Sequence, residues 1–396
     1  MTKDGKNLTI LAGCQGLMMT ANSLLVTTSA LVGFALAENK SMATIPLALV
    51  FLAAMITTIP ASMMMKRIGR RNGFMIGVSF GILGAVISSW SIMKMDFVLY
   101  SFGVTLFGVS NGFGGYYRFA AADGVAVDRR STAISLVLAG GIIAAFIGPN
   151  MASWTRDLIG SMAFIGSYVS LVVVFIISML LLLFLDIKQV DEEHSSKNVR
   201  SIWAIARQPA YIIAVLSALS GFGAMSLIMT ATPLAMHAGK HYFSDTAFVI
   251  QWHMFAMYAP SFVTGWLIRK FGLLNIMLAG VMLIFVCVAL NTNGNSLIHY
   301  WSGLFLLGIG WNFLFIGGTT LLTETYTEPE KAKAQALNDF LIFSNVSFAA
   351  LCAGLVHHSF GWLVVNYSVL PLLTIVVFSI AWLKLKNKRQ IIWSEN

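Results

Sequence analysis

The sequence predicts an all-α polytopic membrane protein with twelve transmembrane helices, arranged as two related bundles of six. The first observation is composition: 58% of the 396 residues are hydrophobic and 10% are charged, whereas about a quarter of a typical soluble domain is charged. The second is length, because about 20 apolar residues cross a hydrocarbon core of roughly 30 Å. The third is a polar stretch near the middle of the chain, at residues 186–208.

Apolar runs, bounded by charged residues or by Gly, Pro and Asn clusters, define the expected helices in order. The first run, residues 8–36, follows two lysines as a signal peptide would, but it is too long for one and many further spans follow. The other spans of the first half are expected at 43–65, 73–93, 97–122, 131–153 and 162–185. Those of the second half are expected at 209–236, 244–268, 272–291, 298–323, 335–357 and 362–384.

The polar stretch divides the chain into an N-terminal six-helix bundle (1–185), a cytoplasmic linker (186–208) and a C-terminal six-helix bundle (209–396). An internal repeat supports this division. The sequence Lys-Arg-Ile-Gly at 66–69 recurs as Arg-Lys-Phe-Gly at 269–272, an offset of 203 residues, and the same offset aligns Arg-Ser-Thr-Ala at 130–133 with Lys-Ala-Gln-Ala at 333–336. Two loops in one register indicate two related, pseudo-symmetric halves.

Basic residues gather in alternate loops, which predicts the orientation in the membrane. With the N-terminus inside, twenty Lys and Arg residues fall on the cytoplasmic side and four fall outside: Lys40, Lys94, Arg156 and Lys240. Both termini of this multi-pass protein are therefore expected on the cytoplasmic side of a plasma (inner) membrane. Since the net charge of +9 lies in these short loops and not on one exposed face, no nucleic-acid partner is expected.

The loop after the second span carries the clearest family signal. It reads Ser-Met-Met-Met-Lys-Arg-Ile-Gly-Arg-Arg at 62–71, and its second copy reads Gly-Trp-Leu-Ile-Arg-Lys-Phe-Gly at 265–272. Both resemble the Gly-x-Leu-x-Asp-Arg-x-Gly-Arg-Arg signature of the major facilitator superfamily. The resemblance implies a secondary-transporter fold and gives gating-loop roles to Lys66, Arg67, Gly69, Arg70, Arg269, Lys270 and Gly272. Lys66 and Arg269 replace the acidic residue of the signature, so its charge pairing is not expected here.

Ionisable side chains inside a bilayer are costly, and each one is a candidate for function. Arg118, late in span 97–122, is expected either to hold an anionic group of a solute or to extend to the cytoplasmic interface. Asp123, Glu324 and Asp339 are candidates for proton coupling, with interface salt bridges as the alternative, and Asp339 is favoured because it interrupts an apolar run. His253 is a further proton candidate, with a structural hydrogen bond as its alternative.

Neutral polar and aromatic residues near the middle of the spans form the expected solute site. Trp311 lies in the centre of span 298–323, where it is expected either to form an aromatic wall for a ring-bearing solute or to pack against a neighbouring helix. The polar members hydrogen-bond either to a solute or between helices. The complete set of expected substrate-binding residues is Gln15, Asn22, Asn111, Tyr117, Arg118, Trp311, Asn312 and Asn345.

These observations predict a secondary active transporter that moves a small organic solute by alternating access, coupled to protons. No P-loop supplies ATP chemistry, and the three cysteines lack metal-site spacing, so no catalytic residue, cofactor or metal is expected. The expected partners are the small-molecule substrate and the lipid bilayer, and the chain is expected to be a monomer and not an enzyme. The alternatives are a non-transporting membrane sensor built on a transporter scaffold and a membrane-embedded lipid-handling enzyme.

Overall fold

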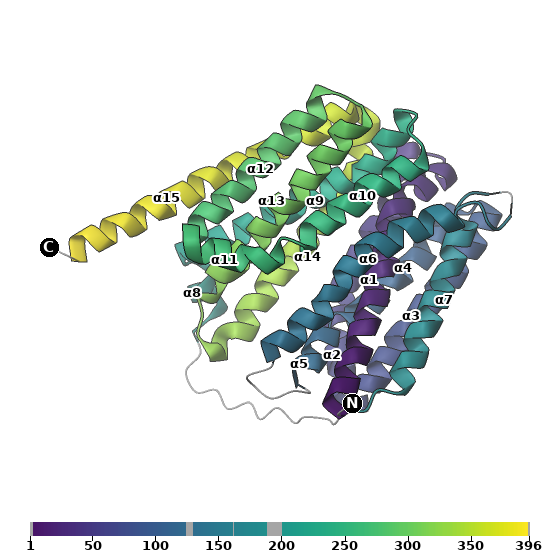
Figure 1. Ribbon diagram of the computed structural model, residues 1–396, viewed down its shortest axis with the longest axis horizontal. Helices are drawn as coiled ribbons and strands as arrows, with labels where there is room; N and C mark the ends of the chain where they lie inside the picture. Colours follow the sequence, from purple (N-terminus) through teal and green to yellow (C-terminus); the bar gives the residue numbers. More distant parts are fainter. Residues whose placement is uncertain (1–2, 124–129, 161, 188–199, 395–396) are drawn as a thin grey trace.

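The protein is described here by a computed structural model, which covers residues 3–123, 130–160, 162–187 and 200–394 (Figure 1). The described residues form helices joined by turns, and no strand occurs among them. This confirms the predicted all-α class. A long apolar helix satisfies all of its own backbone hydrogen bonds, which is the condition for crossing a membrane without exposing polar groups to lipid.

The first half of the chain, here called the N-half, contains helices α1 to α7. Their bounds are α1 Lys3–Leu36, η1 Lys40–Met42, α2 Ile45–Ile68, α3 Arg70–Lys94, α4 Phe97–Gly114, α5 Tyr117–Asp123, α6 Arg130–Thr155 and α7 Ile165–Leu183. The predicted span 97–122 is therefore two helices. The break lies at Gly115 and Tyr116, and the short helix α5 carries Arg118.

The second half, here called the C-half, contains helices α9 to α15, and the short helix α8 Ile202–Ala206 precedes it. The bounds are α9 Pro209–Ala238, α10 Phe243–Tyr258, α11 Ser261–Phe271, α12 Leu273–Asn293, α13 Leu297–Thr323, η3 Glu328–Glu330, α14 Lys331–Tyr367 and α15 Leu370–Ser394. Span 244–268 is broken between α10 and α11 at Pro260, whose nitrogen cannot donate to the helix. Helix α14 changes direction at Gly361, where φ is +79°.

Nine helical segments of the described chain are long and apolar enough to cross a membrane. One of them, Lys333–Lys386, contains two of the predicted spans, separated by the turn at Gly361. Helix α6 and the broken pair α10–α11 occupy two further predicted spans. The nine segments therefore cover ten predicted spans, and α6 and the α10–α11 pair cover the other two.

The two repeated loops adopt the same backbone conformation. Gly69, between α2 and α3, has φ +85° and ψ 154°, and Gly272, between α11 and α12, has φ +88° and ψ 144°. Only glycine adopts this region without strain. The amide of each glycine donates to a carbonyl four residues earlier, Gly69 to Met65 over 3.0 Å and Gly272 to Ile268 over 2.8 Å. The glycine in each copy of the motif is thus required by a tight helix-to-helix turn.

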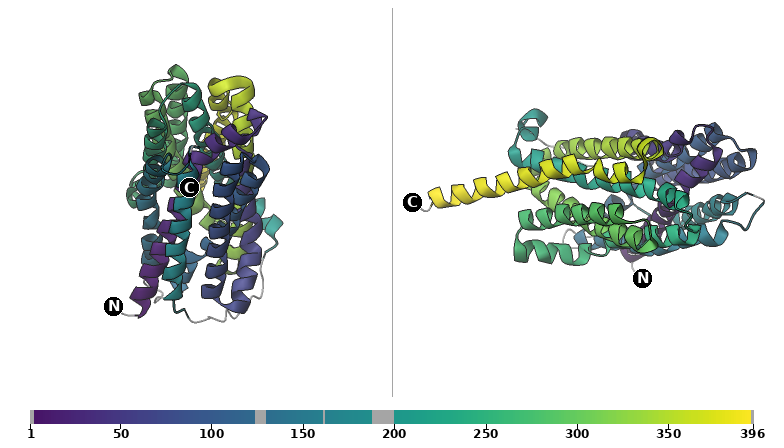
Figure 2. Two further views of the ribbon diagram at one scale, coloured as in Figure 1. Left: turned by 90° about the vertical axis from the view of Figure 1, so that its right-hand side faces the viewer. Right: turned by 90° about the horizontal axis from the view of Figure 1, so that it is seen from above.

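The halves meet along two seams, α2 against α14 and α6 against α10. Figure 1 shows that they lie close together at the end of the bundle farthest from the N-terminus and diverge towards the end that carries both termini, while Figure 2 shows the helices of each bundle packed side by side. We call these the closed end and the open end. At the closed end, the rings of Phe34 (α1) and His237 (α9) lie 5.8 Å apart.

Candidate substrate-binding site

The seam between α2 and α14 is packed from the closed end to the middle of the helices. Thr44 Oγ1 accepts a hydrogen bond from the Gly354 amide at 3.0 Å, and Ser347 donates to the Ala48 carbonyl at 3.0 Å. Nearest the open end among these hydrogen bonds is that of Ser344 Oγ with Met55 Sδ, at 3.4 Å. One helical turn further towards the open end, the residues on the same two faces, Ile59 and Phe340, are 70% and 55% exposed.

The seam between α6 and α10 is also packed. Asn150 donates to Gln251 at 2.5 Å, and the Phe146 ring lies 5.9 Å from that of Trp252. Further towards the open end, the Tyr258 ring lies 3.6 Å from the position that a Cβ on Gly141 would occupy. The contacts between the two halves therefore extend along both seams from the closed end towards the middle of the helices.

Four aromatic side chains of the C-half contact one another, and we call them the aromatic box: Phe222 (α9), Tyr258 (α10), Trp311 and Phe315 (α13). The Trp311 ring stacks on Phe315 with centroids 5.0 Å apart, and Phe222 and Tyr258 approach it edge-on at 5.1 and 6.3 Å. Such edge-to-face and offset-stacked pairs are the favoured arrangements of aromatic rings. The box is thus a preformed aromatic surface of the kind that takes a flat ring.

Two walls of the box face the N-half, which places the box at the seam and not in the interior of the C-half. Phe222 and Phe51 of α2 both pack against a small buried cluster that includes Val346 of α14. Tyr258 faces α6 at Gly141, where the missing side chain leaves room for its ring. Opening or closing of the seam therefore changes the surroundings of both rings.

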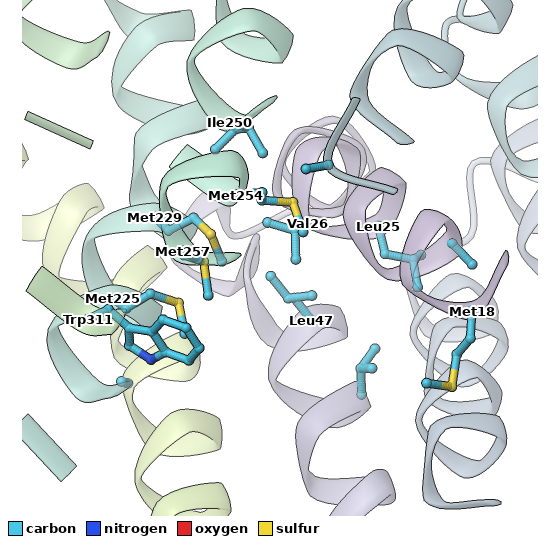
Figure 3. Packing of buried hydrophobic residues seen from close by; sticks show 14 of the residues in the cluster. Met18, Leu25, Val26, Leu47, Met225, Met229, Ile250, Met254, Met257 and Trp311 are labelled. Atoms are coloured by element: carbon cyan, nitrogen blue, oxygen red, sulfur yellow. The ribbon is translucent and has the colours of Figure 1, made fainter. Parts of the chain in front are cut away.

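Methionines line the same region beside the box. Figure 3 shows Met225 of α9 and Met257 of α10 beside Trp311, with Met229 of α9 next to them, while Met254 of α10 lies against Val26 of α1. All four methionines are buried. The thioether is flexible and polarisable, so methionine adapts to irregular shapes and makes favourable contacts with aromatic rings. The site can therefore accommodate a solute by moving side chains while the helices stay in place.

The N-half contributes polar groups. Asn111 of α4 donates to the Asn22 side chain of α1 over 2.8 Å, and both residues are half-buried. Gln15, two helical turns from Asn22 on α1, is buried on the same stripe of the helix. An amide pair that makes one mutual hydrogen bond keeps further donor and acceptor capacity. These residues can bind hydroxyl groups of a solute.

Arg118 and Asp339 oppose each other across the open part of the seam. Arg118 (α5) is half-buried, and its Nε is buried without a hydrogen-bond partner. Asp339 (α14) is exposed and accepts a hydrogen bond from Asn338 at 3.1 Å. The two charges interact electrostatically but do not form a direct ion pair. They are a pair of opposite charges on different halves.

Three predicted substrate residues make contacts within one half. Tyr117 is buried in the N-half, where its ring lies 4.6 Å from that of Phe74. Asn312 is saturated, because its amide donates to the Met257 carbonyl and to Ser261 Oγ and accepts from Thr264 Oγ1, each at 2.7 Å. Asn345 donates to the Leu219 carbonyl at 2.8 Å. We leave Tyr117 and Asn312 out of the site proposed below because their contacts are already complete within their own halves.

The remaining proton candidates lie away from the box. His253 is fully buried between α10 and α13, where Nδ1 bonds to the Leu304 carbonyl at 2.7 Å, so this nitrogen carries the proton. Glu324 ends α13 and lines an exposed surface pocket of about 300 Å³ with Asn275 and Lys384. Asp123 is the last residue of α5, and its side chain lies outside the described part of the structure.

The predicted gating residues lie in the loops at the open end. Lys66, Arg67, Arg269 and Lys270 are exposed, and Arg70 is half-buried. Lys270 lies over the Trp266 ring, with its Nζ 4.8 Å from the centroid. The signature loops thus place two basic clusters at the end of the molecule where the halves diverge, but their gating role stays a prediction.

Two bundles of apolar helices that pack against each other along two seams are typical of one class of protein, the solute transporters of membranes. Residues 11–344 match the Major Facilitator Superfamily, and the chain belongs to this family. The family predicted from the two loops is therefore confirmed.

Relatives of the chain include named transporters. It is 35% identical over 385 residues to the riboflavin transporter RfnT of Brucella anthropi, which covers 97% of this chain and 96% of that protein. It is 29% identical over 379 residues to the MFS-type transporter YddS of Bacillus subtilis, covering 89% and 85% of the two chains. The crystal structure of the human organic anion transporter MFSD10 (TETRAN) matches with a TM-score of 0.67 at 14% identity, covering 96% of this chain and 100% of that one, and shows the same fold.

Proposed function

We propose that this protein transports riboflavin, or a flavin closely related to it, across the membrane. The observation that carries the proposal is the 35% identity to a riboflavin transporter along 97% of the chain, which agrees with the chemistry of the seam. Riboflavin joins a flat three-ring system to a flexible chain of hydroxyl groups. A site for it needs an aromatic surface next to polar side chains.

The site residues divide between these two needs. The aromatic box and the four methionines supply the apolar surface for the ring system. Asn22, Asn111 and Gln15 supply hydrogen-bonding groups on the opposite half for the hydroxyl chain. A solute bound in this way contacts both halves, so its binding couples to their relative position.

The difference between the two ends of the seams supports transport by alternating access. In the described conformation the halves are joined at the closed end, and the inner faces of α2 and α14 are exposed beyond Met55 and Ser344. With the orientation that the basic loops predict, the open end faces the cytoplasm. Transport then requires a rocking motion that separates the closed end and brings the open faces together.

We further propose that transport is coupled to protons through Asp339. Its carboxylate lies on the exposed face of α14, near Arg118 of α5 and Tyr211 of α9. Protonation would remove its attraction to Arg118, and that attraction strengthens as the open end closes. A proton at this position therefore changes the relative stability of the two conformations.

Uptake of radiolabelled riboflavin into proteoliposomes with an imposed pH gradient tests both parts. We expect uptake above protein-free liposomes, and accumulation driven by the gradient. Asp339→Asn should abolish gradient-driven accumulation while leaving downhill flux, and Glu324→Gln, an exposed carboxylate outside the seam, is the matched control. Absence of any riboflavin flux contradicts the function; accumulation by Asp339→Asn equal to that of the wild type contradicts the coupling role alone.

A further inference from the structure

The indole N–H of Trp311 is a buried hydrogen-bond donor without a partner. Trp311 is 5% exposed, and its Nε1 makes no hydrogen bond in the described structure. Leaving a buried donor unsatisfied costs free energy, so most buried indoles find an acceptor. Trp362 of the same half does so, since its Nε1 donates to the Asn291 carbonyl at 3.0 Å.

The surroundings of this N–H differ from those of the other unpartnered indoles. Trp252 and Trp301 also lack a partner, but Trp252 is surrounded by phenylalanine rings and Trp301 stacks on Phe305, with centroids 5.7 Å apart. Trp311 lies in the aromatic box at the seam. Its Cδ1, the carbon bonded to Nε1, lies 3.8 Å from the position that a Cβ on Gly221 of α9 would occupy, and the Leu314 side chain lies 3.2 Å from that position.

The side chains around the Trp311 ring can give way to a solute. Figure 3 places Met225 and Met257 against it, and these unbranched side chains reach alternative rotamers at little cost. Phe222 and Tyr258, the two edge-on walls, both face the N-half, whose position changes as the seam opens. The unsatisfied donor therefore lies where a planar solute would complete the box.

We propose that Trp311 Nε1–H donates a hydrogen bond to a ring carbonyl of the transported flavin and so determines specificity for the ring system. This inference rests on the proposed function and deepens it, because it assigns recognition to the ring and not to the hydroxyl chain. Flat rings that lack an acceptor at this edge leave the donor unsatisfied and bind more weakly. Ring compounds that keep the carbonyls but lack the hydroxyl chain retain this hydrogen bond.

Equilibrium binding to the purified full-length protein in nanodiscs tests the inference. Flavin fluorescence is titrated with wild type, with Trp311→Phe, which keeps an aromatic ring but removes the N–H, and with Trp301→Phe, which removes an unpartnered indole outside the box. The probes are riboflavin and lumichrome, which has the same ring carbonyls but no hydroxyl chain. Thermal unfolding of each variant checks that it is folded.

We expect Trp311→Phe to weaken the binding of both probes by the same factor, about 3- to 10-fold for one lost hydrogen bond, and Trp301→Phe to bind both as the wild type does. Equal binding of riboflavin to wild type and Trp311→Phe would overturn the inference and leave the proposed function intact. If Trp311→Phe weakened the binding of riboflavin alone, the Trp311 N–H would bond to the hydroxyl chain, and the assignment to the ring would be overturned. Wild-type protein that binds neither probe overturns the proposed function as well.

Discussion

Ser344 on α14 contacts Met55 on α2 through an Oγ–Sδ distance of 3.4 Å, and among the hydrogen bonds between the described parts of these two helices it lies nearest the open end. Each helix continues towards the open end with large apolar side chains on the same face, Ile59 and Met63 on α2 and Phe340 on α14, and all three are exposed. Exposed apolar patches mark interaction surfaces, and because these two continue a packed seam, we expect them to meet in another conformation. The pair thus marks the boundary between the closed and the open part of the molecule.

A cysteine pair at Ile59 and Phe340 should therefore report closure of the open end. In a background without Cys14, Cys287 and Cys352, oxidation of Ile59→Cys/Phe340→Cys should form a disulfide that stops transport, and reductant should restore it. Disulfides form only where the two Cα atoms come within about 7 Å. The control pair Ala48→Cys/Ser347→Cys should cross-link directly in the described conformation. An active Ile59/Phe340 pair that never cross-links would show that this seam does not close.

The Arg156 side chain should stabilise the closed end. Its guanidinium carbon lies 5.3 Å from the Phe164 centroid in the N-half and 5.4 Å from the Phe243 centroid in the C-half. Phe164 adopts φ +75°, a left-handed conformation that is rare for a non-glycine residue. Arg156→Gln removes about 1 kcal/mol of cation–π attraction and should favour opening of this end. We expect faster labelling of Ser23→Cys by an impermeant maleimide; an unchanged rate would remove Arg156 from the closure.

Asn312 should matter for stability more than for affinity. Its three hydrogen bonds join α13 to both sides of the break between α10 and α11. Asn312→Ala should destabilise the protein by about 2 kcal/mol, since hydrogen bonds between membrane helices average about 0.6 kcal/mol each. Thermal unfolding and riboflavin titration of the same sample separate the two effects. A large loss of affinity with unchanged stability would return Asn312 to the binding site.

The linker should be held to the C-half by an ion pair that persists at mildly acidic pH. Arg200 Nη2 lies 2.6 Å from Glu330 Oε2, and Arg200 also donates to the Thr325 carbonyl. The hydrogen bond from Arg200 lowers the pKa of Glu330 below its usual range. A carboxyl with a lowered pKa contributes stability above its unfolded-state pKa and loses it only as pH falls through the folded-state value. The Arg200–Glu330 ion pair should therefore persist unchanged between about pH 5 and 8.

Limited trypsin digestion tests whether this ion pair holds the linker. Glu330→Gln should speed cleavage after Arg200 at every pH in that range, whereas Glu324→Gln should not. Cleavage of the wild-type protein that accelerates steeply between pH 8 and pH 5 would indicate that Glu330 titrates there, contrary to the expectation.

The sequence predicted the features that depend on length, charge and glycine. Apolar runs placed the helices, and the repeated loops placed Gly69 and Gly272, whose backbone angles agree within a few degrees in φ. It did not single out Phe222, Tyr258 or the methionines. Lipid-facing and core-facing sides of a membrane helix are both apolar, so composition does not indicate which aromatic side chain turns towards the seam.

Polar residues were equally ambiguous along the sequence. Asn111 and Asn312 both lie in apolar helices, yet Asn111 makes one hydrogen bond, to Asn22 of the same half, whereas Asn312 makes three within the C-half. The difference comes from the break at Pro260, which brings Ser261 and Thr264 towards α13. Only the packed structure separates a side chain that can bind a solute from one that fastens two helices together.

The central claim, that this member of the major facilitator superfamily carries riboflavin across the membrane, is tested most directly by counterflow. Proteoliposomes loaded with unlabelled riboflavin are diluted into a trace of labelled riboflavin without any ion gradient, and internal label is followed over time. The account predicts a transient accumulation of label above its external concentration, absent when the lumen holds an equal concentration of ribitol. Label that never exceeds equilibrium, or that behaves alike with either lumen, would contradict it.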